Sequence, residues 1–194
     1  MKFEYPFGAT PLEPEDIEQL IPTINTQDEL NSLEKINIQM GLVWAEKSRL
    51  LKRELLTYSG LLRLHKELFS KVWKWAGKPR PTEKNSGVAP HQISSETHKL
   101  CEDVKFWILN QTYDWDEIGV RFHHRLVFIH PFVNGNGRHS RIATDLLLMH
   151  NDIKPFSWGA GDLTSEGELR KNYITSLKDA DKGDFLKLMF FVRS

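Results

Sequence analysis

Apolar side chains recur at helical spacing along most of this chain. The clearest stripe, within residues 27–47, consists of Leu30, Leu33, Ile36, Met40, Val43 and Trp44. Thr26 and Glu29 form a capping box directly before it, a common signature of a helix start. The spacing therefore predicts a helix from Gln27 to about Lys47.

The same periodicity predicts most of the remaining chain to be helical. Further helices are expected at residues 58–72, 94–110, 116–129, 137–150, 164–180 and 184–192. Four prolines in residues 1–25 predict an irregular arm with one short helix around residues 13–20. The prolines and glycines of residues 77–87 interrupt the helical pattern and predict a loop or a short hairpin. The expected fold is an all-α bundle with one small hairpin.

Composition narrows the class of protein. With 194 residues the chain is long enough for one full core. The formal net charge of +0 argues against direct nucleic-acid binding or an acidic membrane surface as partner. The single cysteine, Cys101, excludes an internal disulfide. Because neither a signal peptide nor a membrane span is recognisable, we expect a cytoplasmic protein.

The segment from His130 to Arg141 carries the chemistry. It reads His-Pro-Phe-Val-Asn-Gly-Asn-Gly-Arg-His-Ser-Arg. Gly135 and Gly137 allow the backbone to approach a ligand, and the N–H groups of such a turn can form an anion nest at the start of the next helix. Arg138 and Arg141 lie three residues apart, and each can donate two hydrogen bonds to a phosphate. His130 can accept a proton near neutral pH.

Each of these residues also has a purely structural interpretation. His130 could cap a helix, and Arg138 and Arg141 could be solvated surface charges. Asn136 could donate to a phosphate or fix the loop by bonding to its own backbone, and the sequence favours neither. The histidines near this segment lack the His-x-x-x-His or Glu-x-x-His spacing that would predict a zinc site. A phosphate site with an adjacent base is the favoured interpretation.

The same segment resembles the signature of the Fic family, His-Pro-Phe-x-(Asp/Glu)-Gly-Asn-Gly-Arg-x-x-Arg. It matches at His130, Pro131, Phe132, Gly135, Asn136, Gly137, Arg138 and Arg141. The similarity extends over roughly residues 55–192, and residues 3–44 resemble the subgroup called mobile mystery protein B. The resemblance implies a Fic-type helical bundle with a β-hairpin flap. It divides the chain into an N-terminal arm and helix (1–54), packed on a single catalytic core (55–194).

The resemblance also implies roles for individual residues. His130 would be the general base and Arg138 a catalytic phosphate ligand. The donor nucleotide would be bound by Asn134, Gly135, Asn136, Gly137, Arg138 and Arg141. Gly87, Val88 and Ala89 would belong to the flap that binds a target peptide. An inhibitory glutamate would pair with Arg141; Glu34 is a candidate by position only, because the usual inhibitory signature is absent around it.

One position departs from the family pattern. Asn134 stands where the family usually carries the Asp or Glu that binds Mg²⁺. An amide oxygen is a weaker ligand for this ion than a carboxylate, so Asn134 predicts a weakened metal site.

The expected function is transfer of AMP from ATP to a Ser, Thr or Tyr hydroxyl of a target protein, with Mg²⁺ as cofactor. Two alternatives stay open: a degenerate nucleotide-binding protein, and a transferase that uses another phosphate-containing donor. A toxin role is a further alternative, with a small antitoxin or a helix-turn-helix protein as partner. A homodimer is also open.

Overall fold

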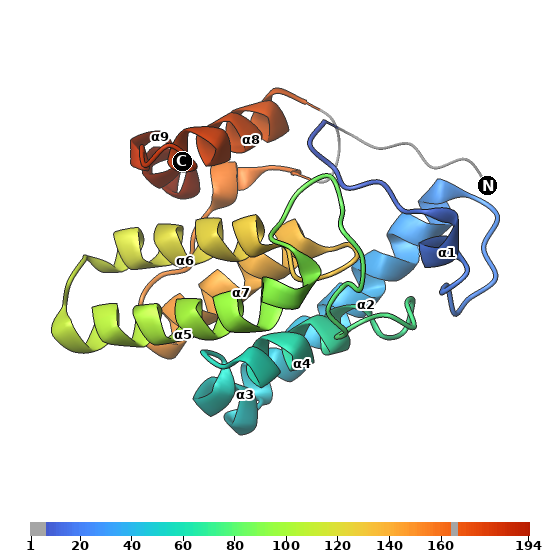
Figure 1. Cartoon of the computed structure of the whole chain (residues 1–194), viewed down its shortest axis with the longest axis horizontal. Helices are drawn as coiled ribbons and strands as arrows, with labels where there is room; N and C mark the ends of the chain where they lie inside the picture. Colours follow the sequence, from blue (N-terminus) through green and yellow to red (C-terminus); the bar gives the residue numbers. More distant parts are fainter. Residues whose placement is uncertain (1–6, 164–166) are drawn as a thin grey trace.

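The computed structural model describes residues 7–163 and 167–194, and these residues form an α-helical fold (Figure 1). An isolated antiparallel bridge between Leu20 and Trp73 is the sole β pairing in these two ranges. The helices are α1 (Pro14–Ile17), α2 (Gln27–Lys47), α3 (Arg49–Glu54), α4 (Tyr58–Phe69), α5 (Ile93–Asn110), α6 (Trp115–Ile129), α7 (Asn136–His150), α8 (Glu168–Ala180) and α9 (Leu186–Arg193). Short 3₁₀ turns lie at Pro90–Gln92 and Trp158–Ala160. The all-α prediction is confirmed.

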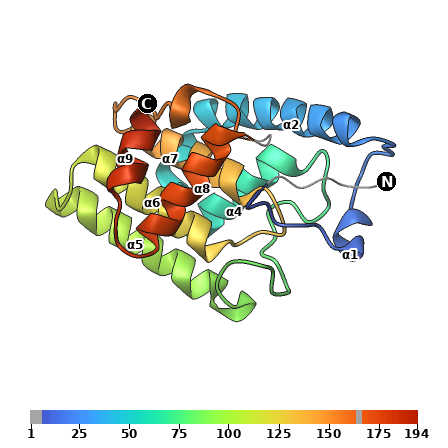
Figure 2. The same cartoon turned by 90° about the horizontal axis from the view of Figure 1, so that it is seen from above.

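The helices pack around two apolar cores. α5, α6 and α7 lie side by side, and α2 and α4 cover one side of this group (Figures 1 and 2). α8 and α9 pack together against the opposite side of α6. The larger core lies among α2, α4, α5, α6 and α7, and a second core lies beneath α8 and α9. Val133, in the loop between α6 and α7 (residues 130–135), belongs to the larger core.

The bounds of α2 agree with the sequence prediction, but only part of its apolar stripe is buried. Ile36, Met40 and Val43 are 53–57 % exposed, whereas Leu33 and Trp44 pack against the core. The buried positions of this helix are Leu30, Glu34, Asn37, Gly41 and Ala45. Apart from Leu30, the helix therefore buries small and polar residues.

Close packing against α4 explains this orientation. A Cβ on Gly41 would lie 2.8 Å from the carbonyl oxygen of Glu67, so a larger residue could not occupy this crossing. The Asn37 amide donates to the same carbonyl (3.1 Å) and accepts from the backbone N–H of Lys71 (2.8 Å). These two hydrogen bonds satisfy a buried amide and fix the rotation of α2.

The expected β-hairpin flap is instead a loop without strands, residues 77–89. The Arg80 side chain, only 2 % exposed, fills its interior. Its guanidinium donates to the carbonyls of His130 (2.7 Å), Thr82 (2.8 Å) and Val88. A buried guanidinium that bonds to loop carbonyls replaces the cross-strand backbone pairs of a hairpin. Arg80 is thus structural and not a solubilising surface charge.

Two further expectations concern the start of α8 and membrane-spanning helices. The helix expected from residue 164 begins at Glu168, and residues 164–166 lie outside the described part of the chain. Across the described ranges, none of the helices has the length and apolarity required to cross a bilayer.

Candidate functional site

The glycine-rich loop leaves the start of α7 open to a ligand. α6 ends at His130, whose backbone is left-handed (φ 53°), and α7 begins after Gly135, which is also left-handed (φ 79°). A Cβ on Gly135 would lie 2.7 Å from the Phe69 ring, so glycine is required by both conformation and space. Within the described residues, no side chain caps this helix start. Its backbone N–H groups, with the positive end of the helix dipole, therefore suit the binding of an anion.

Two buried side chains hold the loop in shape. Asn136 accepts from the backbone N–H of Phe132 (2.9 Å) and donates to its carbonyl (2.8 Å). His65 donates from Nε2 to the Asn134 carbonyl (3.1 Å), because its Nδ1 already accepts from the N–H of Gly77 (2.9 Å). The His65 ring also stacks on Phe132 at 3.6 Å. The Asn136 side chain therefore fixes the loop, the second of the two roles that the sequence left open.

His130 is held unprotonated beside two hydroxyl groups. Burial, and then the nearby Arg80 guanidinium, lower the pKa of its imidazole to about 4. The Thr10 hydroxyl lies 3.0 Å from Nε2, and the Ser86 hydroxyl lies 3.3 Å from Nδ1. In the tautomer protonated at Nδ1, Nε2 accepts from Thr10. His130 can then receive a proton from a hydroxyl group at neutral pH.

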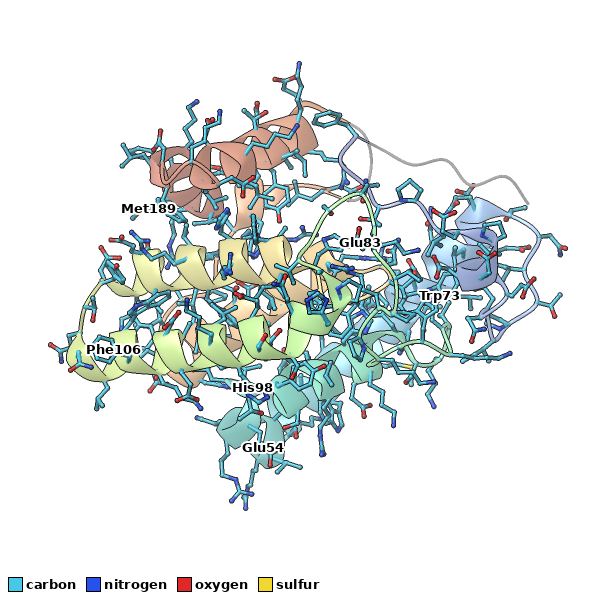
Figure 3. The ribbon with its side chains drawn as sticks, viewed as in Figure 1. Glu54, Trp73, Glu83, His98, Phe106 and Met189 are labelled. Atoms are coloured by element: carbon cyan, nitrogen blue, oxygen red, sulfur yellow. The ribbon has the colours of Figure 1, made fainter. Side chains whose placement is uncertain are left out.

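Glu34 reaches into the site and pairs with the first motif arginine. Its Oε2 lies 2.6 Å from Arg138, and its Oε1 accepts from the Trp73 indole N–H (2.7 Å). Trp73 lies beside α1 and α2 (Figure 3). The expected partner, Arg141, instead lies over the ring of Tyr173, 5.5 Å from its centre. Glu34, a candidate by position only, therefore pairs with Arg138 in the first turn of α7 and not with Arg141, the arginine that an inhibitory glutamate would bind in the family pattern.

The amide of Asn134 is engaged on both sides. Its Oδ1 accepts from the Gly135 N–H (2.6 Å) and from Arg138 (3.4 Å), and its Nδ2 donates to the Thr10 carbonyl (3.2 Å). The three partners fix the orientation of the amide, since a flipped group would place oxygen against oxygen.

These residues fit a protein-bound Mg²⁺ poorly. The Asn134 oxygen is neutral and already accepts from a cation, and the Glu34 carboxylate is bound to Arg138. Among residues 7–163 and 167–194, no three His, Cys, Asp or Glu side chains are placed to hold a metal ion.

A cavity of about 270 Å³ connects these groups. Every candidate from the motif lines it, as does Glu34: His130, Asn134, Gly135, Asn136, Gly137, Arg138 and Arg141. Residues 8–10 and helix α8 form its other walls. Gly87, Val88 and Ala89 lie outside this lining, although a Cβ on Gly87 would lie 2.7 Å from that of His130.

Sequence reasoning missed three residues of this site. Thr10 and Tyr173 are more than forty positions from His130, and His65 lies on an ordinary amphipathic helix. No local pattern marks any of them, because each contributes through a contact between distant segments.

Comparison with known proteins agrees with this geometry. The Fic/DOC family matches residues 55–148. Protein adenylyltransferase fic-1 of Caenorhabditis elegans is 28 % identical over 124 residues, which are 60 % of this chain and 22 % of that protein. Protein adenylyltransferase Fic of Nematostella vectensis is 23 % identical over 163 residues, 82 % of this chain and 36 % of that protein. The chain thus spans about a fifth to a third of the length of these relatives.

Solved structures share the fold. The FIC domain of Bep8 from Bartonella sp. 1-1C superimposes with a TM-score of 0.69 at 16 % identity, over 91 % of this chain and 90 % of that one. A fragment of Fic-1 from C. elegans gives 0.62 at 24 % identity, over 92 % of this chain and 51 % of that one. The family match assigns residues 55–148 to the Fic/DOC family, and the solved structures show that the chain shares the fold of Fic domains.

Proposed function

We propose that this protein transfers AMP from ATP to a hydroxyl group of a protein. One observation carries the proposal: an unprotonated His130, the open start of α7 and Arg138 all face the same cavity. A hydroxyl, a phosphate group and a base can meet there. Two relatives named protein adenylyltransferase support the same reaction.

The reaction follows from the positions of these groups. Nε2 of His130 accepts the proton of the incoming hydroxyl, whose oxygen attacks the α-phosphorus of ATP. The bond between the α-phosphorus and the oxygen bridging to the β-phosphate breaks, and pyrophosphate leaves. The N–H groups of residues 136 and 137 and the Arg138 guanidinium stabilise the negative charge that develops on the phosphates.

Glu34 restrains this site. Its carboxylate occupies the Arg138 guanidinium that a nucleotide phosphate would bind. Glu34 therefore competes with the nucleotide, and the protein rests in a restrained state until Arg138 is released.

Asn134 favours a second candidate, a protein that binds nucleotide but transfers it slowly. Without a carboxylate at this position, Mg²⁺ would depend on the nucleotide phosphates and water for its ligands. An antitoxin or helix-turn-helix partner, a homodimer, a different donor and membership of the mobile mystery protein B subgroup all stay predictions.

ATP labelled at the α-phosphate or at the γ-phosphate tests the proposal. The protein is incubated with Mg²⁺, each labelled ATP and a mixture of cellular proteins, beside the variants His130→Ala and Asn134→Asp. We expect protein-bound label from α-labelled ATP only, its loss in His130→Ala, and stronger labelling in Asn134→Asp. Label from γ-labelled ATP, or equal labelling by His130→Ala, would contradict AMP transfer by this site. ATP binding with no labelling by the wild type or Asn134→Asp would favour the degenerate alternative.

A further inference from the structure

A segment of the chain itself occupies the position next to the proposed base. The arm segment, residues 7–13, contributes Gly8, Ala9, Thr10 and Leu12 to the lining of the cavity. Thr10 is 8 % exposed, and its hydroxyl oxygen lies 3.0 Å from Nε2 of His130. This is the nitrogen to which an acceptor hydroxyl would give its proton.

Polar side chains from the rest of the chain donate hydrogen bonds to the backbone carbonyls of the arm segment, at Thr10 and at residues before it. Asn134 donates to the carbonyl of Thr10 (3.2 Å), and Asn85 donates to that of Ala9 (3.2 Å). Arg170, on α8, donates to that of Phe7 (2.7 Å). These hydrogen bonds are made to backbone carbonyls. They therefore hold Thr10 in place whatever side chains its neighbours in the sequence carry.

An ion pair anchors the segment after Thr10. Lys84, in the loop of residues 77–89, lies 2.6 Å from Asp16 of α1, and the two side chains are 4 % and 16 % exposed. A shielded pair of this kind resists screening by salt better than a surface pair. Lys84 thus fixes α1 to the loop of residues 77–89. The chain is therefore held both before and after Thr10.

Asn134 suits this arrangement better than the usual carboxylate would. Its Nδ2 donates to the Thr10 carbonyl, whereas an aspartate oxygen would face that carbonyl as a second acceptor. Asn134, which departs from the family signature, therefore helps to hold the arm segment in place.

We propose that Thr10 is an intramolecular acceptor of AMP in this protein, an inference that rests on the proposed function. The Thr10 hydroxyl gives its proton to Nε2 of His130, and its oxygen bonds to the α-phosphorus of ATP. The bond from that phosphorus to the oxygen bridging to the β-phosphate breaks, and pyrophosphate leaves. The products are AMP-Thr10, pyrophosphate and the proton held by His130. Because Thr10 and the anion loop line one cavity, the acceptor is presented at a high effective concentration.

Mass spectrometry of the full chain after incubation with ATP and Mg²⁺ tests this assignment. Trypsin releases residues 3–35 as one peptide, and its fragment ions distinguish Thr10 from Tyr5, Thr23, Thr26 and Ser32. We expect one added AMP on Thr10, with a rate constant independent of protein concentration. Thr10→Ser should retain the modification and Thr10→Ala should lose it. Thr23→Ala, which removes an exposed threonine between α1 and α2, is the matched control and should behave as the wild type.

Pyrophosphate release and AMP transfer to other proteins are measured in the same wild-type samples. Transfer to other proteins without modification of Thr10 would overturn this inference and leave the proposed function intact. Neither pyrophosphate nor any AMP-protein would overturn both. AMP on Thr10 at a rate proportional to protein concentration would show transfer between molecules and contradict the intramolecular step. If Thr10→Ala fails to fold, the wild-type peptide and Thr10→Ser still show whether AMP is attached to residue 10.

Discussion

At the scale of single residues, the groups that would act on a nucleotide already have partners within the chain. Arg138 binds Glu34, Asn134 bonds to the backbone of Thr10, and His130 contacts the Thr10 hydroxyl. Each partner comes from the first 47 residues, outside the segment that carries the signature. The N-terminal part of the chain therefore sets the resting state of the site.

Glu34→Gln should release Arg138 while leaving the fold intact. The amide of glutamine can still accept from the Trp73 indole, which Glu34→Ala would leave buried and unpaired. Loss of the charged pair should speed pyrophosphate release from ATP about tenfold, equivalent to ~1.4 kcal/mol. The initial rate of pyrophosphate release at limiting ATP measures the effect. Glu46→Gln, at an exposed position on the same helix, is the control. An unchanged rate in Glu34→Gln would show that the pair does not restrain the site.

Buried histidines should make stability depend on pH. Burial lowers the pKa of His65, His123, His130 and His139, to about 4 for the last two. Below about pH 6.5 the unfolded chain therefore binds protons that the folded chain does not, and stability falls as pH drops towards 4. Urea unfolding at several pH values in this window measures the slope.

A histidine variant separates this effect from that of carboxylates. His139 is fully buried and bonds to the Leu61 carbonyl, which a glutamine amide can also reach. His139→Gln should reduce the slope of unfolding free energy by about 1 kcal/mol per pH unit between its folded and unfolded pKa values. His91→Gln, at an exposed position, should leave the slope unchanged. Equal slopes in all three proteins would refute the assignment.

At the scale of elements, the placement of α2 decides which residues meet at the site. Gly41 and Asn37 bring α2 against α4, and this rotation directs Glu34 toward α7. The open start of α7 then supplies the anion site. Ile36, Met40 and Val43 face away from this contact, whereas Leu30, from the same apolar stripe, is buried and lines the cavity.

Substitutions on the two faces of α2 should differ in cost. Gly41→Ala inserts a methyl group against the α4 backbone and should destabilise the protein by about 1–2 kcal/mol, after a gain of ~1 kcal/mol in helix propensity. Met40→Ala, at a 57 % exposed position, should change stability by less than about 0.5 kcal/mol. Urea unfolding compares the two variants. A costly Met40→Ala with a neutral Gly41→Ala would mean that the stripe is the buried face.

Sequence periodicity predicted where α2 begins and ends because the capping box and the helical spacing are local properties. It did not predict the buried face, since close packing favoured glycine and asparagine over larger apolar residues. The motif likewise predicted His130 and the anion loop. The motif could not predict the Glu34–Arg138 pair or the contact between Thr10 and His130, because each joins residues more than a hundred positions apart.

At the scale of the whole molecule, the loop of residues 130–135 is anchored in the larger core through Val133. α2, the arm segment and α8 all contribute residues to the lining of the cavity. Binding of a phosphate by Arg138 would therefore require this residue to release Glu34.

Calorimetric titration with ATP tests most directly whether this cavity is a nucleotide site. The wild type is titrated with and without Mg²⁺, beside Arg138→Ala and, as a control, the exposed Arg53→Ala of α3. We predict saturable binding of one ATP that Arg138→Ala weakens at least about tenfold and Arg53→Ala leaves unchanged. Binding of equal strength in Arg138→Ala, or no binding by the wild type or by Glu34→Gln, would contradict the assignment of the α7 start as the phosphate site.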